Sequence, residues 1–189
     1  TDITPGSYSI TANNWKIVNF NDKAYFFQRG YDPLVYDNSN GLRTFTVVNG
    51  GATNATFKCN EALAAFGRLF IVDNATDTQT IYWSDLLVGN DFSGGSSGSI
   101  DVTKVWPDGY DEVVALAAHN NNLVVFGEHS IILYEGATSP ASMTLADTVS
   151  GVGCIDRNSV QSYCLCRTLD CEALVEPYRK RHCQLATLA

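Results

Sequence analysis

The sequence predicts an all-β, β-propeller-like fold with an incomplete set of about three four-stranded antiparallel blades. One plan of short apolar strands and polar turns occurs three times. The third strand of each unit ends in an aromatic residue, with spacings of 47 and 51 residues between Tyr36, Trp83 and Tyr134. A period of roughly 40–50 residues with about four short strands per unit is typical of propeller blades. In addition, no segment before about residue 160 sustains a helical period.

The first unit is expected to contain four strands and to end in a Gly-rich exit turn at 49–51. Its apolar runs are separated by Asn, Asp and Gly residues, which is the pattern of strands joined by turns. The expected strands are 15–20, 24–27, 34–36 and 44–48, with a hairpin turn at 21–23.

The second and third units repeat this plan, with hairpin turns at 67–68 and 120–122. A Gly- and Ser-rich segment at 91–99 predicts a flexible loop. The expected strands of the second unit are 62–66, 69–72 and 81–83, with further strand residues at 100–102 and 105–106. Those of the third are 113–118, 123–126 and 131–134, with further strand residues at 143–145 and 151–154.

The composition limits the possible functions. A chain of 189 residues is long enough for one domain with a sizeable core, but three blades are fewer than the four to eight that usually close a ring. We therefore expect residues 1–160 to form propeller-like blades. Either other polypeptide completes the ring, or the chain is part of something larger. No apolar run approaches the roughly 18–20 residues that span a bilayer, so no membrane span is expected. With 20 acidic and 12 basic residues the net charge is −8, which disfavours tight binding to nucleic acid.

Residues 161–189 are expected to form a separate, atypical Cys-rich tail. Glycine does not occur after Gly153 and asparagine does not occur after Asn158, although both are abundant earlier in the chain. Strand alternation and turn chemistry therefore disappear together. One interpretation is that the reading frame of this segment is shifted. The alternative is a short helix packed on the edge of the sheet, and the sequence leaves both open.

The residues that could bind a metal lack the spacing that metal sites need. Structural zinc sites usually present Cys-x(2–4)-Cys pairs, and the tail does not, so incidental thiols are favoured over zinc. The tail residues concerned are Cys164, Cys166, Cys171, His182 and Cys183. The segment 73–77 lacks the central Gly and the distal Glu of a helix–loop–helix calcium site, so it predicts an ordinary polar hairpin. We expect no metal and no cofactor.

The sequence also predicts no enzyme activity. It contains no Gly-x-Ser-x-Gly nucleophile elbow and no Gly-Lys-Ser phosphate loop. His119 and His129 lie at expected turns, where a solvated imidazole is favoured over a general base. The candidate functional positions are therefore the recurring aromatic residues Tyr36, Trp83 and Tyr134. Rings at such places are expected to fill the space between neighbouring blades, and the alternative is an exposed surface for stacking carbohydrate.

The third unit and its continuation carry an ordered series of short motifs. The hairpin Phe126-Gly127-Glu128-His129-Ser130-Ile131 is followed by Pro140, then by Gly151-Val152-Gly153-Cys154 and by Ser159-Val160. In order and spacing, this series resembles the propeller region of the tail tubular protein B, or nozzle, family of short-tailed, T7-like bacteriophages. The likeness is best over residues 112–160, and the looser repeats over 14–92 agree with it. After Val160 that family continues with another strand, whereas the Cys-rich tail begins here.

The resemblance implies a structural protein of the virion tail that forms part of the DNA-ejection conduit. The expected assembly is a homohexamer in contact with the adaptor, tail tubular protein A, and with tail fibre proteins. DNA would pass through it transiently and without specific binding. The acidic composition suits this role, because a lumen lined by carboxylates repels phosphate. The alternative function is a soluble propeller module that binds glycan or protein ligands.

Overall fold

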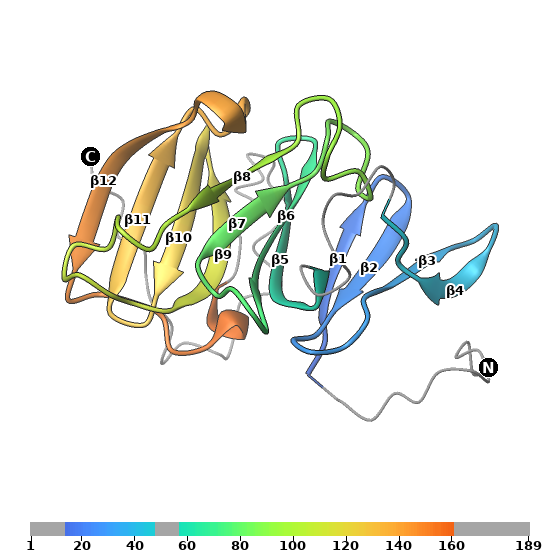
Figure 1. Cartoon of the computed structure of the whole chain (residues 1–189), viewed down its shortest axis with the longest axis horizontal. Helices are drawn as coiled ribbons and strands as arrows, with labels where there is room; N and C mark the ends of the chain where they lie inside the picture. Colours follow the sequence, from blue (N-terminus) through green and yellow to red (C-terminus); the bar gives the residue numbers. More distant parts are fainter. Residues whose placement is uncertain (1–13, 48–56, 161–189) are drawn as a thin grey trace, which may run out of the picture.

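The computed structural model describes residues 14–47 and 57–160, and it consists of three four-stranded antiparallel sheets (Figure 1). The first sheet contains β1 (Lys16–Phe20), β2 (Lys23–Phe27), β3 (Leu34–Asp37) and β4 (Gly41–Thr44). The second contains β5 (Cys59–Ala65), β6 (Arg68–Asn74), β7 (Thr80–Trp83) and β8 (Gly98–Asp101). The third contains β9 (Val113–His119), β10 (Asn122–Gly127), β11 (Ser130–Glu135) and β12 (Thr144–Ser150). Two short 3₁₀ helices, η1 (Pro140–Ser142) and η2 (Arg157–Ser159), accompany the sheets.

The sheets are arranged as neighbouring blades. Within each sheet the strands follow one another in chain order, and the first strands of the three sheets lie side by side, β1 against β5 and β5 against β9 (Figure 1). The first strand of each blade is thus the innermost one, as in a propeller, but the three sheets do not close a ring. This arrangement confirms the expected all-β, incomplete propeller-like fold.

Each sheet begins with a two-residue hairpin. In the first hairpin Phe20 pairs with Lys23, and the intervening Asn21 and Asp22 have φ angles of 49° and 59°. Positive φ at both positions matches the right-handed twist of the flanking strands, and Asn and Asp tolerate it. The second hairpin turns through Phe66 and Gly67, at φ 51° and 68°. A positive φ is unusual for a bulky residue such as Phe66. Its ring packs edge-on against that of Phe70, with the ring centroids 6.3 Å apart.

The fourth strand of the first sheet differs from the expected one, since β4 covers Gly41–Thr44 and not 44–48. The side chain of Asp37 accepts hydrogen bonds from the N–H groups of Ser39 and Asn40, and Gly41 follows with a φ of 67°. This tight turn starts the return strand early. Phe45 then leaves the strand and is buried between the first two sheets. The expected residue 48 lies outside the described residues.

Two other segments form no strand and contribute one buried residue each, Trp106 and Cys154. Trp106 lies beyond β8 and is buried, and its indole N–H donates to Gln79 Oε1 at 2.7 Å. Residues 151–154 follow the long outer strand β12 and form no strand of their own. In both places the apolar residues were expected to lie in strands because sequence alternation does not distinguish a strand from a buried loop.

Alternate residues of each strand face the preceding and the following sheet, and they form two cores between the sheets. The core between the first and second sheets contains Tyr25, Phe27 and Val35 on one side and Leu69 and Ile71 on the other. The core between the second and third sheets has equivalent members, including Phe70, Val72, Trp83, Leu123, Val125 and Tyr134. The second sheet is therefore covered on both faces.

Candidate functional site

Two of the three candidate aromatic residues fill the core between the second and third sheets. Trp83 is 4% exposed and Tyr134 is 3% exposed. The indole N–H of Trp83 donates to the carbonyl of Ser96 at 3.0 Å, so its polar edge is satisfied. Gly98 stands opposite Trp83 in β8, where an added Cβ would lie 2.7 Å from the indole ring. Trp83 and Tyr134 therefore occupy the space between blades and are not available to stack a ligand.

The three aromatic residues are not all equivalent. Tyr36 pairs with Ala24 and Tyr134 pairs with Leu123, and both of these partners are the second residue after their hairpin turn. Trp83 pairs with Phe70, the third residue after its turn. Successive side chains in a strand point to opposite faces, so Tyr36 and Tyr134 face the preceding sheet and Trp83 faces the following one. The spacing of 47 and 51 residues concealed this shift of one position.

Tyr36 belongs to a face of the first sheet that no other sheet covers within the described residues. We call this the outer face of the first sheet, formed by Ile17, Ala24, Phe26, Leu34 and Tyr36. Tyr36 is half-buried there. Ile17 is 57% exposed, whereas its equivalents Ala62 and Leu116 are 1% and 3% exposed in the cores between sheets. Leu34 on this face is itself buried, at 5% exposed. The positions of Ala24, Phe26 and Tyr36, whose equivalents are buried in the second and third sheets, are partly open in the first, as is that of Ile17.

A buried ion pair joins the innermost strands of the first and second sheets. Lys16 Nζ lies 2.7 Å from Glu61 Oε1, and the Glu61 side chain is fully buried. Burial raises the pKa of Glu61 to about 7, although Lys16 and Arg157 beside it act to lower the pKa. This carboxyl group therefore titrates near neutral pH.

Arg157 ties the end of the described chain back to the first two sheets. It comes from η2, is 4% exposed, and its guanidinium donates to the carbonyl and side-chain oxygens of both Asn14 and Asn60. Asn14 precedes β1, and Asn60 precedes Glu61 within β5. Five fixed donors make arginine well suited to bridge several carbonyl groups at once. Arg157 thus clamps the ends of the inner strands together.

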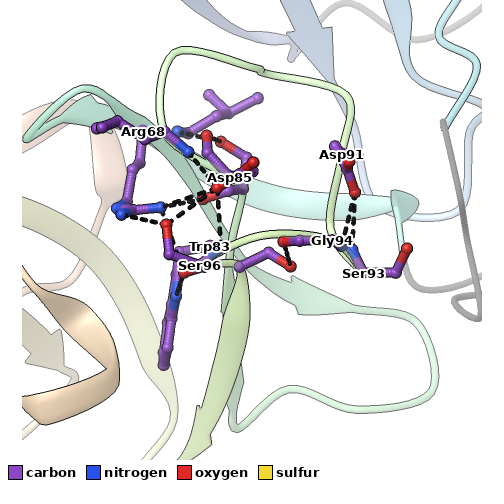
Figure 2. Close-up of polar contacts among 11 residues, drawn as sticks. Arg68, Trp83, Asp85, Asp91, Ser93, Gly94 and Ser96 are labelled. Carbon is purple, nitrogen blue, oxygen red and sulfur yellow. Dashed lines mark hydrogen bonds and ion pairs between the residues drawn. The ribbon is translucent and has the colours of Figure 1, made fainter.

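Hydrogen bonds hold the loop between β7 and β8 in a defined path, although its composition suggested flexibility (Figure 2). The carboxylate of Asp85 accepts from the N–H groups of Leu86 and Ser96 at 2.8 and 2.9 Å. The hydrogen bonds from these N–H groups lower the pKa of Asp85, and the one from Ser96 has the largest effect. Buried Arg68 donates to the carbonyls of Ser84 and Ser96 and to the Ser96 hydroxyl. The loop nevertheless exposes three successive apolar residues, Leu86, Leu87 and Val88.

Several residues of the motif series meet at one place beside the third sheet. The N–H of Cys154 donates to the carbonyl of Gly127 at 2.8 Å, and its sulfur lies 3.1 Å from the Ser159 hydroxyl. An added Cβ on Gly153 would lie 2.2 Å from the carbonyl oxygen of Glu128, and one on Gly127 would lie 2.3 Å from Asp111. Glycine is therefore needed at both positions for close approach.

Asp111 supports the same hairpin. Its carboxylate accepts hydrogen bonds from the N–H groups of Glu112, Glu128 and His129. Burial acts to raise the pKa of Asp111, but these three N–H groups outweigh it and the pKa is lowered. His129 is itself 78% exposed and lies 3.6 Å from this carboxylate. The arrangement fixes a turn and leaves the imidazole in solvent.

No group of three or more His, Cys, Asp or Glu side chains is positioned for a metal within residues 14–47 and 57–160. The segment 73–77 forms a turn in which Asn74 Oδ1 accepts from the N–H groups of Thr76 and Asp77. His119 is exposed at the end of β9. Cys59 and Cys154 are buried thiols that form no disulfide. The cysteine and histidine residues of the tail lie outside the described residues.

Sequence reasoning missed Glu61, Arg157 and Asp111 as organising residues. A signal existed for Glu61, because it directly precedes the apolar run Ala62-Leu63-Ala64-Ala65, and a charge there is expensive to bury without a partner. No such signal existed for Arg157, whose acceptors Asn14 and Asn60 lie 143 and 97 positions away in the sequence.

No protein-family model matches this chain, and no curated protein matches it. In the part of the chain that the structure describes, no helix combines the length and apolar character needed to cross a bilayer.

Proposed function

We propose that this chain is a structural component of a phage tail, part of a nozzle-like conduit through which DNA is ejected. The observation that carries the proposal is the spatial grouping of the motif series in the third blade. Gly153 and Cys154 closely approach or contact the hairpin that contains Gly127, and Ser159 in turn contacts Cys154. A series whose order and spacing reflect one packing unit is a better basis for resemblance than unrelated short matches.

The charge of the chain supports the same function. The net charge is −8, and DNA carries one negative charge per about 1.7 Å of helix axis. A negatively charged conduit wall lets DNA slide, because acidic side chains outnumber the basic ones that could bind phosphate. In this proposal six copies surround the conduit, next to the adaptor, tail tubular protein A, and tail fibre proteins. The chain then acts through shape and assembly and is not an enzyme.

Purified particles of the phage that encodes the chain provide the test. We expect peptides of residues 14–160 in the proteome of gradient-purified virions, and antibody labelling at the tail. Lysate from cells that express the chain without phage serves as the control for adherent contaminants. A chain that is absent from virions, or that labels the capsid alone, would contradict the tail function.

A binding module for glycans is the second candidate, favoured by aromatic side chains at the surface of the first sheet. Tyr31, in the loop between β2 and β3, is 39% exposed, and its ring centroid lies 6.0 Å from that of Trp15. Tyr36 is half-buried in β3. Rings at a surface stack on the apolar faces of sugars. Binding of the purified chain to a glycan array, lost in Tyr31→Ala and kept in Tyr110→Ala, would favour this candidate over the first.

A further inference from the structure

The outer face of the first sheet has the same construction as two faces that are already covered. Phe26 is equivalent to Ile71 and Val125, because each pairs with the matching residue of its innermost strand. Ile71 and Val125 are completely buried by the preceding sheet, whereas Phe26 is only half-buried. Ile17 is likewise more exposed than its equivalents Ala62 and Leu116. The outer face of the first sheet thus has apolar residues at the positions where the other two sheets contact a preceding sheet.

The two covered faces show what kind of surface fits. In both cores, the surface that covers the next sheet is the side of a four-stranded sheet that faces the sheet after it in the chain. In the first sheet this surface contains Tyr25, Phe27 and Val35. In the second sheet the equivalent residues are Phe70, Val72 and Trp83. Within the described residues both of these surfaces already pack against a neighbouring sheet. The third sheet has the one such surface that no described sheet covers.

The third sheet has such a surface, formed by Val124, Phe126, Ile131, Leu133 and Val149. Cys154 and Val160 pack against its inner part. Its outer part is open, since Ile131 and Leu133 are half-buried and Val149, opposite Ile131, is 44% exposed. One chain therefore carries both complementary surfaces at opposite ends of its row of blades.

We infer that the outer face of the first sheet binds the third sheet of a second copy of this chain. Two such contacts, related by a two-fold axis, join two rows of three blades into a closed ring of six. Propeller rings usually contain four to eight blades, and six is the single multiple of three within that range. A head-to-tail contact that closes in this way yields a discrete dimer and not a filament. A six-copy assembly would hold three such rings.

Light scattering coupled to gel filtration, under reducing conditions and over a range of concentrations, tests the inference. The full chain is expected to have twice its monomer mass of 20.6 kDa. Ile17→Asp places a carboxylate on the outer face of the first sheet, and Val149→Asp places one on the opposing surface. Each substitution is expected to raise the dissociation constant at least about tenfold, because it buries an unpaired charge. Both side chains are exposed in the single chain, so folding is expected to be preserved, which circular dichroism checks.

Leu145→Asp is the matched control. Leu145 lies in the same strand as Val149 and is 49% exposed, but it pairs with Tyr134 and faces the opposite side of the sheet. It should leave the dimer unchanged. A mixture of the Ile17→Asp and Val149→Asp variants keeps one intact contact and should dimerise more strongly than either variant alone.

Three outcomes would overturn the inference: a wild-type chain that is monomeric at all concentrations, a dimer that Ile17→Asp breaks but Val149→Asp does not, and a mixture that gains nothing. The second outcome would indicate two first sheets packed face to face. Dimerisation and association with virions are separate measurements, so failure of one does not imply failure of the other.

Discussion

Glu61 combines complete burial with a partner of the opposite charge, and its titration should be visible in the stability of the protein. Its pKa is about 7 in the folded chain, compared with 4.5 as the ordinary value. The folded state therefore binds the proton more tightly than the unfolded state. The contribution of Glu61 to stability is fully present below pH 4.5 and is lost as the pH rises through 7. The size of this loss is at most about 3 kcal/mol.

Urea unfolding between pH 5 and pH 8 measures this effect. The wild-type free energy of unfolding should decline over that interval, and Glu61→Gln should flatten the decline because the amide does not titrate. Glu128→Gln, at an exposed position in the β10–β11 turn, is the control and should keep the wild-type slope. An unchanged slope in Glu61→Gln would assign the pH dependence to another group.

The two equivalent tyrosines provide a second comparison at the residue scale. Tyr134→Ala removes a ring from the core between the second and third sheets and should lower the free energy of unfolding by about 3–5 kcal/mol. Tyr36→Ala removes the same ring from a half-buried position and should cost less than about 2 kcal/mol. Both are measured by urea unfolding in dilute solution. Equal losses would mean that the outer face of the first sheet is covered in the single chain.

The roles of these side chains were predictable only in part. Rings that close a third strand are expected between blades, and Trp83 and Tyr134 lie there. Whether a ring is covered depends on the neighbouring sheet, and in the described residues Tyr36 has no such neighbour. A spacing near fifty residues also cannot fix the face of a strand, because a shift of one residue reverses it.

At the scale of single elements, the loop between β7 and β8 depends on one carboxylate. Asp85 holds both ends of the loop through Leu86 and Ser96 (Figure 2). Asp85→Ala removes these acceptors, so the amides of residues 86–97 should exchange with solvent faster, while β6 stays protected. Asp108→Ala, at an exposed position between β8 and β9, is the control. Hydrogen exchange read by mass spectrometry makes the comparison, and an unaffected loop would contradict a role for Asp85.

The innermost strands and hairpins were predicted well because alternation and turn residues are local signals. β1, β5 and β9 with their following strands lie close to the expected ranges. The outer strands were predicted less well. β4 begins early because Asp37 and Gly41 create a turn, and Phe45 moves into the core. These differences arise from contacts between sheets, which alternation within one strand does not encode.

At the scale of the whole molecule, the second sheet shares a core with each neighbour, and this should couple the three sheets. All seven residues of β6 are buried, whereas six of the seven in β12 are exposed. Separate unfolding of one outer sheet would expose a face of the second sheet as well. The cost of that exposure favours a single cooperative transition.

Leu69→Ala and Leu123→Ala test this coupling, because they remove the same side chain from equivalent positions in the two cores. Both leucines are completely buried, so each substitution should cost about 2–5 kcal/mol. If the sheets unfold together, either variant shifts one common transition, and hydrogen exchange at β2 and β10 follows the same urea midpoint. A variant Leu69→Ala that releases β2 at lower urea than β10 would instead show that the first sheet unfolds by itself. Independent unfolding would agree with a first sheet whose outer face is covered only when a second copy binds. In the dimer, β2 and β10 would then be expected to share one urea midpoint.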